Sequence, residues 1–370
     1  MNPMSNSKTL NSFLENRQIN IKSSPLFDTN LPPIQSSQGF KWSRIEGMML
    51  GLAIGDALGN TSEGMTPQER KARFGEIRDF LPHPQVASQP IGLPSDDSQL
   101  AFWTLEQMNL DKGFNPENIA QKFCTHHING IGSTVLRFKI NHKKRGNPWH
   151  QSGVKSAGNG ALMRIAPMII PHLKSGSSNL WVDTALSAML THNDSSSIAA
   201  CLSFIYMIWQ LLQMNTTPDA NWWLRTYVSI AKDLEIDNSY RPRGGAFTNY
   251  SGYLWQFVQE KVTQAYSRQL SVVDACNQWY SGSYLLETVP TVIYILMRHG
   301  NNLEEAIIRA VNDTQDNDTV GAIVGAIMGA LHGKEKIPSR WLSKLAGRVD
   351  GDDDDKVLAI IESARKIWWQ

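Results

Sequence analysis

Residues 47–59, GMMLGLAIGDALG, and residues 321–333, GAIVGAIMGALHG, carry a glycine at every fourth position among apolar residues. Residues four apart lie on one face of an α-helix, so each stretch predicts a helix with a smooth glycine stripe. Each glycine costs a helix about 1 kcal/mol relative to alanine. We expect the close approach of another helix backbone to compensate that cost. The two helices are therefore predicted to lie at the centre of the fold.

Helical periodicity continues along most of the chain after Phe40. Apolar residues recur at spacings of three and four, while the alternation typical of strands is rare. We therefore predict an all-α protein with one large domain over residues 41–370. The expected helices lie near residues 42–59, 97–110, 116–128, 180–190, 196–213, 220–233, 252–266, 271–279, 288–298, 303–311, 319–332, 339–347 and 356–369.

Residues 1–40 differ from the rest of the chain because they are rich in Asn, Ser, Gln and Pro and lack hydrophobic periodicity. A segment of this composition cannot bury enough apolar surface to fold alone. We therefore predict a flexible N-terminal extension. Its few apolar residues, among them Phe13, Leu26 and Ile34, leave open that it docks on the body or on a partner.

The composition is that of an ordinary globular protein, with 41% hydrophobic and 19% charged residues. The formal net charge is only +1, so nothing indicates nucleic acid as a partner. No apolar signal core begins the sequence. The most apolar run, residues 320–331, is shorter than the roughly 20 residues that span a bilayer. The three cysteines show no zinc or disulfide spacing, so we expect a cytoplasmic protein without membrane contact.

Two short acidic motifs carry the clue to chemistry: SDDS at residues 95–98 and DNDT at residues 316–319. Each lies where a loop leads into a helix, next to hydroxyl side chains. Clustered carboxylates repel one another unless a cation neutralises them, and hard divalent cations take oxygen ligands. Brought together, the two motifs predict a site for one or two magnesium-like ions. Ordinary helix N-caps are the alternative interpretation of each motif.

Three further stretches add polar groups. Asp56 lies near the end of the first glycine-rich helix, where a carboxylate is disfavoured unless something compensates it, and Glu63 follows in a loop. The stretch GNGALMR, residues 158–164, offers backbone N–H groups that can contact phosphate oxygens, although Asn-Gly also marks ordinary turns. Thr191-His192 closes an apolar helix, and His192 is either a structural histidine or part of a pocket lining.

In chain order these motifs read G-D-A-x-G and a later Glu, S-D-D-S, G-N-G-A-x-M-R, T-H and D-x-D-T. The ordered set resembles the ADP-ribosylglycohydrolases of the dinitrogenase-reductase-activating type, over about residues 43–370. The resemblance implies a single large orthogonal bundle of helices. It also implies an enzyme that hydrolyses the bond between ribose and a protein side chain or small acceptor. Two Mg²⁺ ions, with Mn²⁺ as the alternative, are the implied cofactors.

The resemblance also assigns roles to residues. It implies metal ligation by Ser95, Asp96, Asp97, Asp316, Asp318 and Thr319, and substrate binding by Gly158, Asn159, Gly160 and His192. Metal ions can orient ribose hydroxyls and lower the pKa of a bound water, and a carboxylate can accept the proton of that water. Glu63 and Asp97 are the candidates for this catalytic role. An ADP-ribosyl-arginine protein is the expected substrate.

The chain departs from the family pattern at two places. Thr314 and Gln315 replace the two glycines that commonly precede the second acidic motif. Larger side chains there are expected to narrow the pocket or reshape its loop. The stretch GIGST at residues 130–134 lacks the aspartate of a D-I-G-x-T-like loop, which predicts an altered acceptor preference.

Residues 1–40 lie outside the minimal family pattern. They are similar to extensions of bacterial members that act as immunity proteins against ADP-ribosyltransferase toxins. This implies a cognate toxin, bound through residues 1–40, as a second partner. Two alternatives stay open: a binding-only immunity protein, and a hydrolase of small ADP-ribose conjugates. Retention of all the ligand types argues against a vestigial site.

Overall fold

The computed structural model describes residues 5–34 and 40–370, and within these residues it contains helices and isolated β-bridges but no strand. The helices are α1 (Asn6–Glu15), α2 (Ser43–Asn60), α3 (Pro67–Phe74), α4 (Asp96–Asp111), α5 (Pro116–Thr125), α6 (Ser133–Lys139), α7 (Asn179–Thr191), α8 (Ser195–Gln213), α9 (Ala220–Leu234), α10 (Leu254–Ser267), α11 (Val272–Trp279), α12 (Leu285–His299), α13 (Leu303–Asp313), α14 (Asn317–His332), α15 (Ser339–Leu342) and α16 (Lys356–Trp368). Short helical turns are η1 (Pro25–Asp28), η3 (Pro84–Val86), η4 (Ile140–Lys144), η5 (Trp149–Gln151), η6 (Ala166–His172) and η7 (Lys334–Lys336). The prediction of an all-α fold is confirmed.

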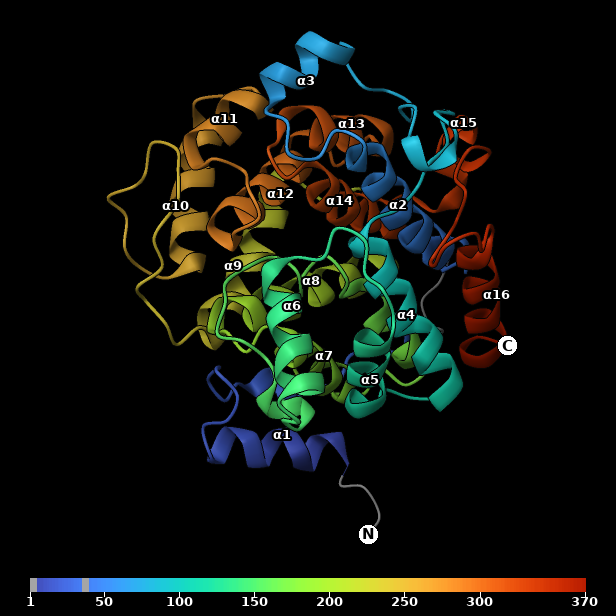
Figure 1. Ribbon diagram of the computed structural model, residues 1–370. Coiled ribbons are helices and arrows are strands. Elements are labelled where there is room, and N and C mark those ends of the chain that lie inside the picture. Colours follow the sequence, from blue (N-terminus) through green and yellow to red (C-terminus); the bar gives the residue numbers. More distant parts are fainter. Residues whose placement is uncertain (1–4, 35–39) are drawn as a thin grey trace.

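The two glycine-rich helices, α2 and α14, lie side by side in the middle of the body (Figure 1). A Cβ added at Gly47 would lie 2.6 Å from the carbonyl oxygen of Gly329, and one added at Gly321 would lie 2.5 Å from that of Gly55. Real Cβ atoms do not approach a carbonyl oxygen so closely. The helices therefore pack backbone to backbone along their glycine stripes, and the pairing runs antiparallel.

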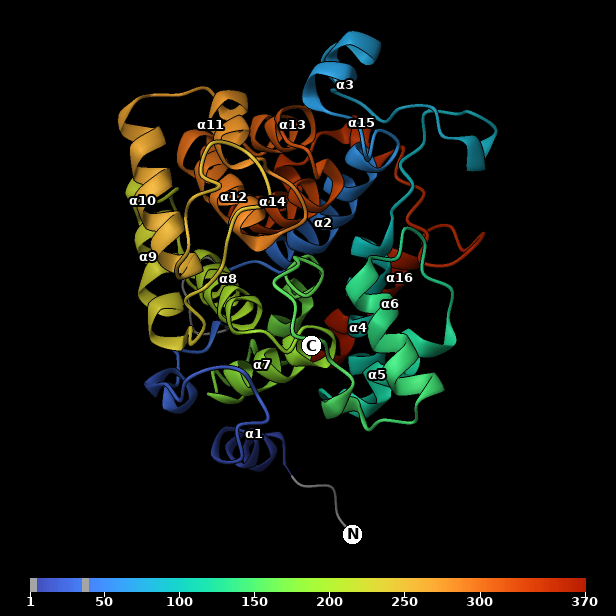
Figure 2. The ribbon, with the colours of Figure 1, turned by 60° about the vertical axis from the view of Figure 1, so that its left-hand side comes forward.

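The helix α3 was not predicted, although its start carries a recognisable sequence signature. Thr66 and Glu69 form a capping box, in which each side chain accepts a hydrogen bond from the backbone N–H of the other residue, and Pro67 occupies the first turn. The helix has few apolar residues, so periodicity alone does not reveal it. It lies on the rim of the body (Figure 2).

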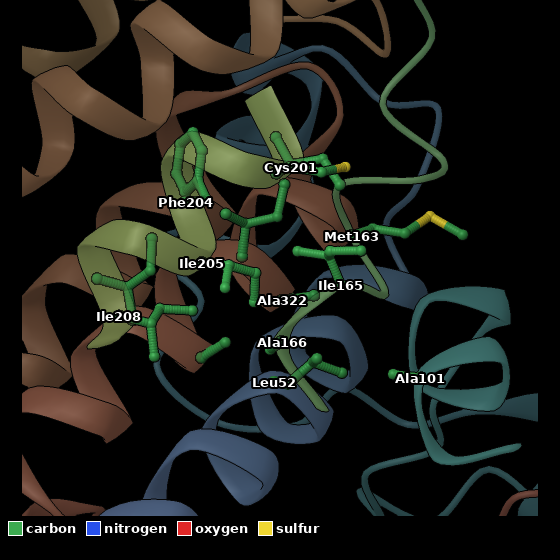
Figure 3. Close-up of a cluster of buried hydrophobic side chains, with 14 of the residues drawn as sticks. Leu52, Ala101, Met163, Ile165, Ala166, Cys201, Phe204, Ile205, Ile208 and Ala322 are labelled. Carbon is green, nitrogen blue, oxygen red and sulfur yellow. The ribbon is translucent and has the colours of Figure 1, made fainter. Parts of the chain in front are cut away.

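A hydrophobic core surrounds the α2–α14 pair (Figure 3). Leu52 from α2, Ala101 from α4, Ile205 from α8 and Ala322 from α14 meet in one cluster, and each is fully buried. Apolar burial on this scale is the main stabilising contribution to a fold of this size. The core therefore fixes the relative positions of the helices that carry the acidic motifs.

The helix α8 alone, among the described helices, is long and apolar enough to cross a membrane by those two criteria. In its most apolar window 89% of the residues are buried inside the protein. Fully buried Cys201, Ile205 and Trp209 show that its apolar surface faces protein. We therefore assign α8 to the core.

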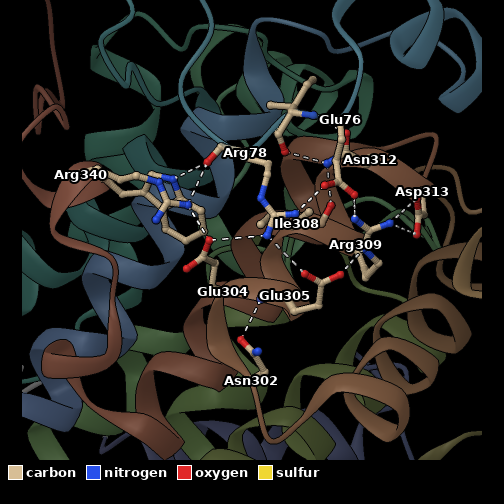
Figure 4. Close-up of polar contacts among 12 residues, drawn as sticks. Glu76, Arg78, Asn302, Glu304, Glu305, Ile308, Arg309, Asn312, Asp313 and Arg340 are labelled. Carbon is tan, nitrogen blue, oxygen red and sulfur yellow. Dashed lines mark hydrogen bonds and ion pairs between the residues drawn. The ribbon is translucent and has the colours of Figure 1, made fainter.

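An ion-pair network holds α13 against the segment that follows α3 (Figure 4). Arg309 pairs with Glu76 and, at 2.9 Å, with Glu305. Arg340 of α15 donates to Glu304 at 2.6 Å and to Asp79 at 2.8 Å. These groups are partly exposed, so each pair adds little stability alone. The network joins three segments that are far apart in the sequence: residues 76–79, α13 and α15.

The N-terminal segment differs from the predicted flexible extension. Residues 5–34 pack on the body, with α1 lying against α7 (Figure 1). Leu10 and Ile34 are fully buried, and Phe13 contacts the ring of Trp149 at a centroid distance of 5.8 Å. The apolar residues are too few to form a core of their own, but they complete the core of the body. Residues 5–34 thus show docking on the body, one of the two arrangements that the sequence left open, while residues 1–4 and 35–39 of the predicted extension lie outside the described residues.

Candidate active site

The antiparallel packing of the two glycine stripes places the end of α2 beside the beginning of α14. A Cβ added at Gly59 would overlap the backbone of Asp318, so the two chains touch at this position. The Asn317 side chain donates a hydrogen bond to the Gly59 carbonyl oxygen at 3.1 Å. The acidic motif at residues 316–319 is therefore fixed beside the loop that carries Glu63.

The start of α4 is attached to the same place by Asp56 of α2. The Asp56 carboxylate accepts hydrogen bonds from the backbone N–H groups of Ser95, at 2.9 Å, and Ser98, at 3.0 Å. It also accepts one from the Ser98 hydroxyl at 2.6 Å. Capping of α4 by a side chain from another helix is the compensation that a carboxylate near the end of α2 requires.

The predicted metal ligands are not ordinary helix N-caps. Ser95 precedes α4 and Asp316 precedes α14, but neither side chain caps its helix. The Ser95 hydroxyl instead donates to Asp97 Oδ2 at 3.1 Å, and the Thr319 hydroxyl donates to the same oxygen at 3.4 Å. The hydroxyl and carboxylate groups of the two motifs thus face one another.

Three carboxylates form the tightest part of this cluster. One oxygen from each of Asp56, Asp97 and Asp318 lies within 4.8 Å of the others, and all three residues are buried. Asp97 Oδ1 is buried without a hydrogen-bond partner among the described residues. Both Asp56 oxygens accept hydrogen bonds from the backbone N–H of Ser95, immediately before α4, whereas Asp97 Oδ1 stays available to a ligand.

Burial and mutual repulsion disfavour the charged forms of the carboxyl groups in the cluster. Burial, opposed by hydrogen bonds from Ser98 and Ser95, raises the pKa of Asp56 to about 7. Burial and repulsion from Asp318 raise the pKa of Asp316 to about 8. Burial followed by repulsion from neighbouring carboxylates also raises the pKa values of Asp96 and Asp97 well above the ordinary range.

Glu63 lies at the edge of the cluster on the loop after α2. Burial, and then the charges of Asp318 and Asp56, raise the pKa of Glu63 to about 7. Its carboxylate lines the cavity described below and has no hydrogen-bond partner among the described residues. A carboxyl group with a pKa near neutrality is suited to accept and return a proton.

These groups fit a hard divalent cation. The donor set consists of carboxylate and hydroxyl oxygens, which Mg²⁺ and Mn²⁺ accept as ligands. The unpartnered Asp97 Oδ1 and the mutual repulsion of the buried aspartates are both relieved by a bound cation. Arg70 is buried behind the cluster, but its guanidinium donates to Ser62 and to the carbonyls of Thr314 and Met65 instead.

The cluster forms one end of a cavity of about 290 Å³. Its walls come from segments far apart in the sequence. They include the predicted residues Glu63, Asp96, Asp97, Gly158, Asn159, Gly160, His192, Asp316, Asp318 and Thr319, together with Thr134, Ser156, Arg243, Ser283 and Tyr284. The cavity therefore brings the acidic motifs, the glycine motif and His192 together, as the sequence predicted.

The glycine motif differs in detail from the expected phosphate cradle. The Gly158 N–H donates to the Ser156 hydroxyl at 3.3 Å, and the Asn159 N–H donates to the Ser283 carbonyl at 3.1 Å. Of the three backbone N–H groups, only that of Gly160 has no acceptor among the described residues. The cradle of N–H groups is thus reduced, because the protein uses two of its donors to join the motif to neighbouring loops.

The Asn159 side chain makes two contacts that the sequence did not predict. Its side-chain amide donates to Asp316 Oδ2 at 2.6 Å and to the Thr288 hydroxyl at 3.0 Å. Asn159 therefore orients a candidate metal ligand. The glycines on either side provide room for His192, because a Cβ at Gly160 would lie 3.0 Å from an imidazole carbon.

Arg243 and Tyr284 are site residues that the sequence did not reveal. Arg243 donates from Nε and Nη2 to the fully buried carboxylate of Glu287, at 3.1 and 2.8 Å. Its guanidinium lies over the Tyr284 ring, 5.1 Å from the centroid. Arg243 belongs to the irregular segment between α9 and α10. No motif or periodicity marks such a segment.

A second hollow of about 460 Å³ adjoins the cavity and shares Glu63, Arg243 and Asp316 with it. Gln315 lines this outer hollow, whereas Thr314 is buried and donates to the Ala310 carbonyl at 2.7 Å. Of the two residues that replace glycines, only Gln315 therefore faces a space that a substrate can enter.

The fold and the site together define an all-helical protein whose central cavity is lined by buried carboxylates. The profile of the ADP-ribosylglycohydrolase family matches residues 37–367, and the chain belongs to this family. It is therefore an enzyme of the ADP-ribosylglycohydrolase class, acting on substrates that carry ADP-ribose.

Similar proteins occur in bacteria and archaea. An uncharacterised protein of Archaeoglobus fulgidus is 29% identical over 310 residues, which cover 81% of this chain and 90% of that protein. The "ADP-ribosyl-[dinitrogen reductase] glycohydrolase" of Rhodospirillum rubrum is 26% identical, over 87% of this chain and 96% of that protein. The "ADP-ribosylarginine hydrolase Tri1" of Pseudomonas putida is 26% identical, over 82% and 74%.

A solved structure described as an "ADP-ribosylglycohydrolase-related protein complex" has the same fold. It superposes with a TM-score of 0.65 and 23% identity, over 88% of this chain and 98% of that one. At this level of identity the likeness concerns the fold alone. It agrees with the all-helical architecture predicted from the sequence.

Proposed function

We propose that this protein is a divalent-cation-dependent hydrolase that removes ADP-ribose from modified proteins, with ADP-ribosyl-arginine as its preferred linkage. The observation that carries the proposal is the meeting of two acidic motifs around the unpartnered Oδ1 of Asp97. The names of the relatives from Rhodospirillum rubrum and Pseudomonas putida support ADP-ribosylated proteins as the substrate class.

The proposed cation site uses the oxygens of both motifs. Its ligands are Ser95, Asp96, Asp97, Asp316, Asp318 and Thr319, with room for two Mg²⁺ or Mn²⁺ ions in the proposed assignment. When bound, such ions polarise ribose hydroxyls and lower the pKa of a coordinated water. Asp56 and Asn159 orient this set through their hydrogen bonds to Ser95 and Asp316.

Hydrolysis breaks the bond between ribose C1″ and the guanidinium nitrogen of the modified arginine. The oxygen of water forms the new bond to C1″, one water proton passes to Glu63, and Glu63 returns this proton to the leaving nitrogen. We assign the proton transfer to Glu63 rather than Asp97, because Asp97 is fully buried whereas Glu63 reaches both the cavity and the outer hollow. A group that bridges the two spaces can take a proton on one side and return it on the other.

The outer hollow is proposed to receive the modified side chain. Glu63 and Asp316 supply negative charge there, which suits a guanidinium. Arg243 is already paired with Glu287, so its charge is largely neutralised. Small ADP-ribose conjugates remain the alternative substrates, because the same cavity would accept their ADP-ribose part.

Release of free ADP-ribose from an ADP-ribosyl-arginine protein tests this proposal. Release with Mg²⁺ or Mn²⁺, its loss with EDTA, and little release from a serine-linked substrate are the expected results. The Asp316→Ala and Asp318→Ala variants should be inactive. Metal binding without release from either protein substrate would favour small conjugates or a binding-only role.

Binding of a cognate toxin through residues 1–40 stays a prediction. The apolar anchors of residues 5–34 are occupied by contacts with the body, so a toxin would have to bind their outer surface or displace them. Cytoplasmic location is likewise proposed. The three cysteines are buried and free, which suits a reducing compartment.

A further inference from the structure

His192 faces the active-site cavity with one ring nitrogen that no protein group engages. The residue is 1% exposed, and its Nδ1 lies 2.9 Å from the Thr191 hydroxyl. Its Nε2 has no hydrogen-bond partner among the described residues, and it lies against the glycine motif. A Cβ at Gly158 would be 3.4 Å from Nε2, and one at Gly160 would be 3.3 Å away. A polar atom of a buried side chain that opens to a cavity and has no protein partner points to a ligand.

The direction of the hydrogen bond between Thr191 and His192 follows from Arg164. Arg164 Nη2 donates to the Thr191 hydroxyl oxygen at 2.9 Å. A guanidinium only donates, so this oxygen acts as an acceptor toward Arg164. The single hydroxyl proton of Thr191 then has Nδ1 of His192 as its acceptor among the described residues. A proton on Nδ1 would leave the buried hydroxyl proton of Thr191 without an acceptor, so the contacts favour an unprotonated Nδ1 and a proton on Nε2.

Arg164 is held firmly enough to set this direction. It is fully buried, and it also donates to the Ser187 hydroxyl at 3.2 Å and to the Ser187 carbonyl at 2.9 Å. Its guanidinium lies 5.1 Å from the centroid of the Phe123 ring. Burial, together with the charge of Arg164, lowers the pKa of His192 to about 3, so the ring stays neutral near pH 7.

We propose that Arg164 acts through Thr191 to hold His192 in its Nε2–H tautomer, which presents one fixed donor to a phosphate oxygen of the ADP-ribose diphosphate. The identity of that oxygen rests on the proposed function, whereas the tautomer follows from the protein alone. Together with the free N–H of Gly160, the imidazole restores part of the cradle that Gly158 and Asn159 do not provide. Arg164 and Thr191 are positioning residues, because neither contacts the ligand.

The tautomer is measured by long-range ¹H–¹⁵N NMR spectra of the full-length protein with labelled histidine, and a His192→Gln variant assigns the signal. The expected result for the wild type is a protonated Nε2 and an unprotonated Nδ1. Thr191→Val removes the donor to Nδ1 and should give a mixture of tautomers, whereas Thr191→Ser should keep the wild-type state. Thr184→Val is the matched control, because Thr184 lies buried in the same helix with a hydroxyl that has no partner.

An Arg164→Met variant tests whether Arg164 determines which ring nitrogen of His192 carries the proton. The guanidinium polarises the Thr191 hydroxyl toward donation and disfavours an N–H on the facing Nδ1. Without it this preference should weaken, so part of the proton population should shift toward Nδ1. Thermal unfolding confirms that each variant is folded before its spectrum is interpreted. Two results would overturn the proposed action of Arg164 through Thr191. One is a wild-type ring protonated at Nδ1, and the other is an unchanged tautomer in folded Thr191→Val and Arg164→Met proteins.

Binding of ADP-ribose in the presence of Mg²⁺ tests the ligand separately. Thr191→Val should weaken binding by about three- to tenfold, the cost of one misaligned hydrogen bond. Thr191→Ser and Thr184→Val should bind as the wild type does. A wild-type protein that fails to bind ADP-ribose counts against the proposed function. The NMR spectrum still tests whether Arg164 and Thr191 set the tautomer of His192. Normal binding by a Thr191→Val protein with mixed tautomers would overturn the donor role of His192.

Discussion

The carboxylate of Asp56 in α2 accepts the backbone N–H of Ser95, 2.9 Å away, and so holds the first turn of α4 against the end of α2. The two residues are far apart in the sequence, yet this contact decides where the first acidic motif points. Packing of the core places α4 beside α14, and this hydrogen bond then orients the Ser95 and Asp97 side chains toward Asp318. The geometry of the candidate metal site therefore depends in part on one buried carboxylate that need not bind the metal.

Removal of that carboxylate should damage both stability and cation binding. We expect Asp56→Ala to lower the free energy of unfolding by about 1–3 kcal/mol, because buried N–H groups lose their acceptor. Mn²⁺ affinity, measured calorimetrically, should fall by at least tenfold. Asp219→Ala is the control, because Asp219 also accepts backbone N–H groups at a helix start, that of its own helix α9, at a distant, exposed site. Equal Mn²⁺ affinity in the Asp56→Ala and wild-type proteins would refute the positioning role.

The glycine stripes should tolerate no side chain. A Cβ at Gly325 would overlap the carbonyl oxygen of Gly51 on the facing helix. We expect Gly325→Ala to destabilise the protein by about 1–3 kcal/mol in urea unfolding, despite the better helix propensity of alanine. Gly113→Ala is the control, since nothing lies near its Cβ position. A stabilised Gly325→Ala protein would show that the helices can move apart freely.

We expect the charge of Asp318 to lower stability in the absence of metal and to be needed for cation binding. Asp318→Asn keeps the shape of the side chain but removes one charge from the buried cluster, so it should raise the melting temperature without added metal. Mg²⁺ should stabilise the wild type, by about 2.7 kcal/mol at a hundredfold excess over its Kd, but not the variant. Asp352→Asn should behave as the wild type, because its side chain is 97% exposed. A full Mg²⁺-induced shift in the Asp318→Asn protein would exclude Asp318 as a ligand.

Because of Glu235, we expect the free energy of unfolding to fall as the pH rises. Burial, opposed by the N–H groups of Leu254 and Trp255, raises the pKa of Glu235 to about 8 in the folded protein, from 4.5. Its contribution to stability is therefore complete below pH 4.5 and is lost as the pH rises through 8. Between these values the slope reaches at most about 1.4 kcal/mol per pH unit.

A Glu235→Gln variant isolates this effect. Its free energy of unfolding should depend less steeply on pH between 5 and 8 than that of the wild type, with saturating Mg²⁺ in both samples. Asp233→Asn, at an exposed position in the last turn of α9, the helix that Glu235 follows, should give the wild-type curve. Parallel curves for the wild type and Glu235→Gln would show that Glu235 does not titrate in this range.

The N-terminal segment should contribute to the stability of the body. Leu10 of α1 is fully buried, so we expect Leu10→Ala to cost about 2–5 kcal/mol in chemical unfolding. Asn11→Ala, at an exposed position of the same helix, should cost little. If both variants were as stable as the wild type, residues 5–34 would be free to leave the body and reach a toxin.

Local patterns in the sequence determined which segments became helices. The periodicity near residues 196–213 and 303–311 reappears as α8 and α13, because an apolar face every three to four residues is itself a helical property. The two glycine stripes also predicted their own central packing. The ordered motifs predicted which polar residues gather, since Asp97, His192 and Asp318 line one cavity.

Only the tertiary structure decided how those residues act. Asp56 became a cap for α4, Asn159 became a partner of Asp316, and Arg243 entered the site from an irregular segment. Docking of residues 5–34 was decided in the same way. Each outcome depends on atoms distant in the sequence that meet after the core has packed. Helix formation depends on neighbours in the chain, which the sequence displays, whereas hydrogen-bond partners across the fold depend on positions that only packing sets.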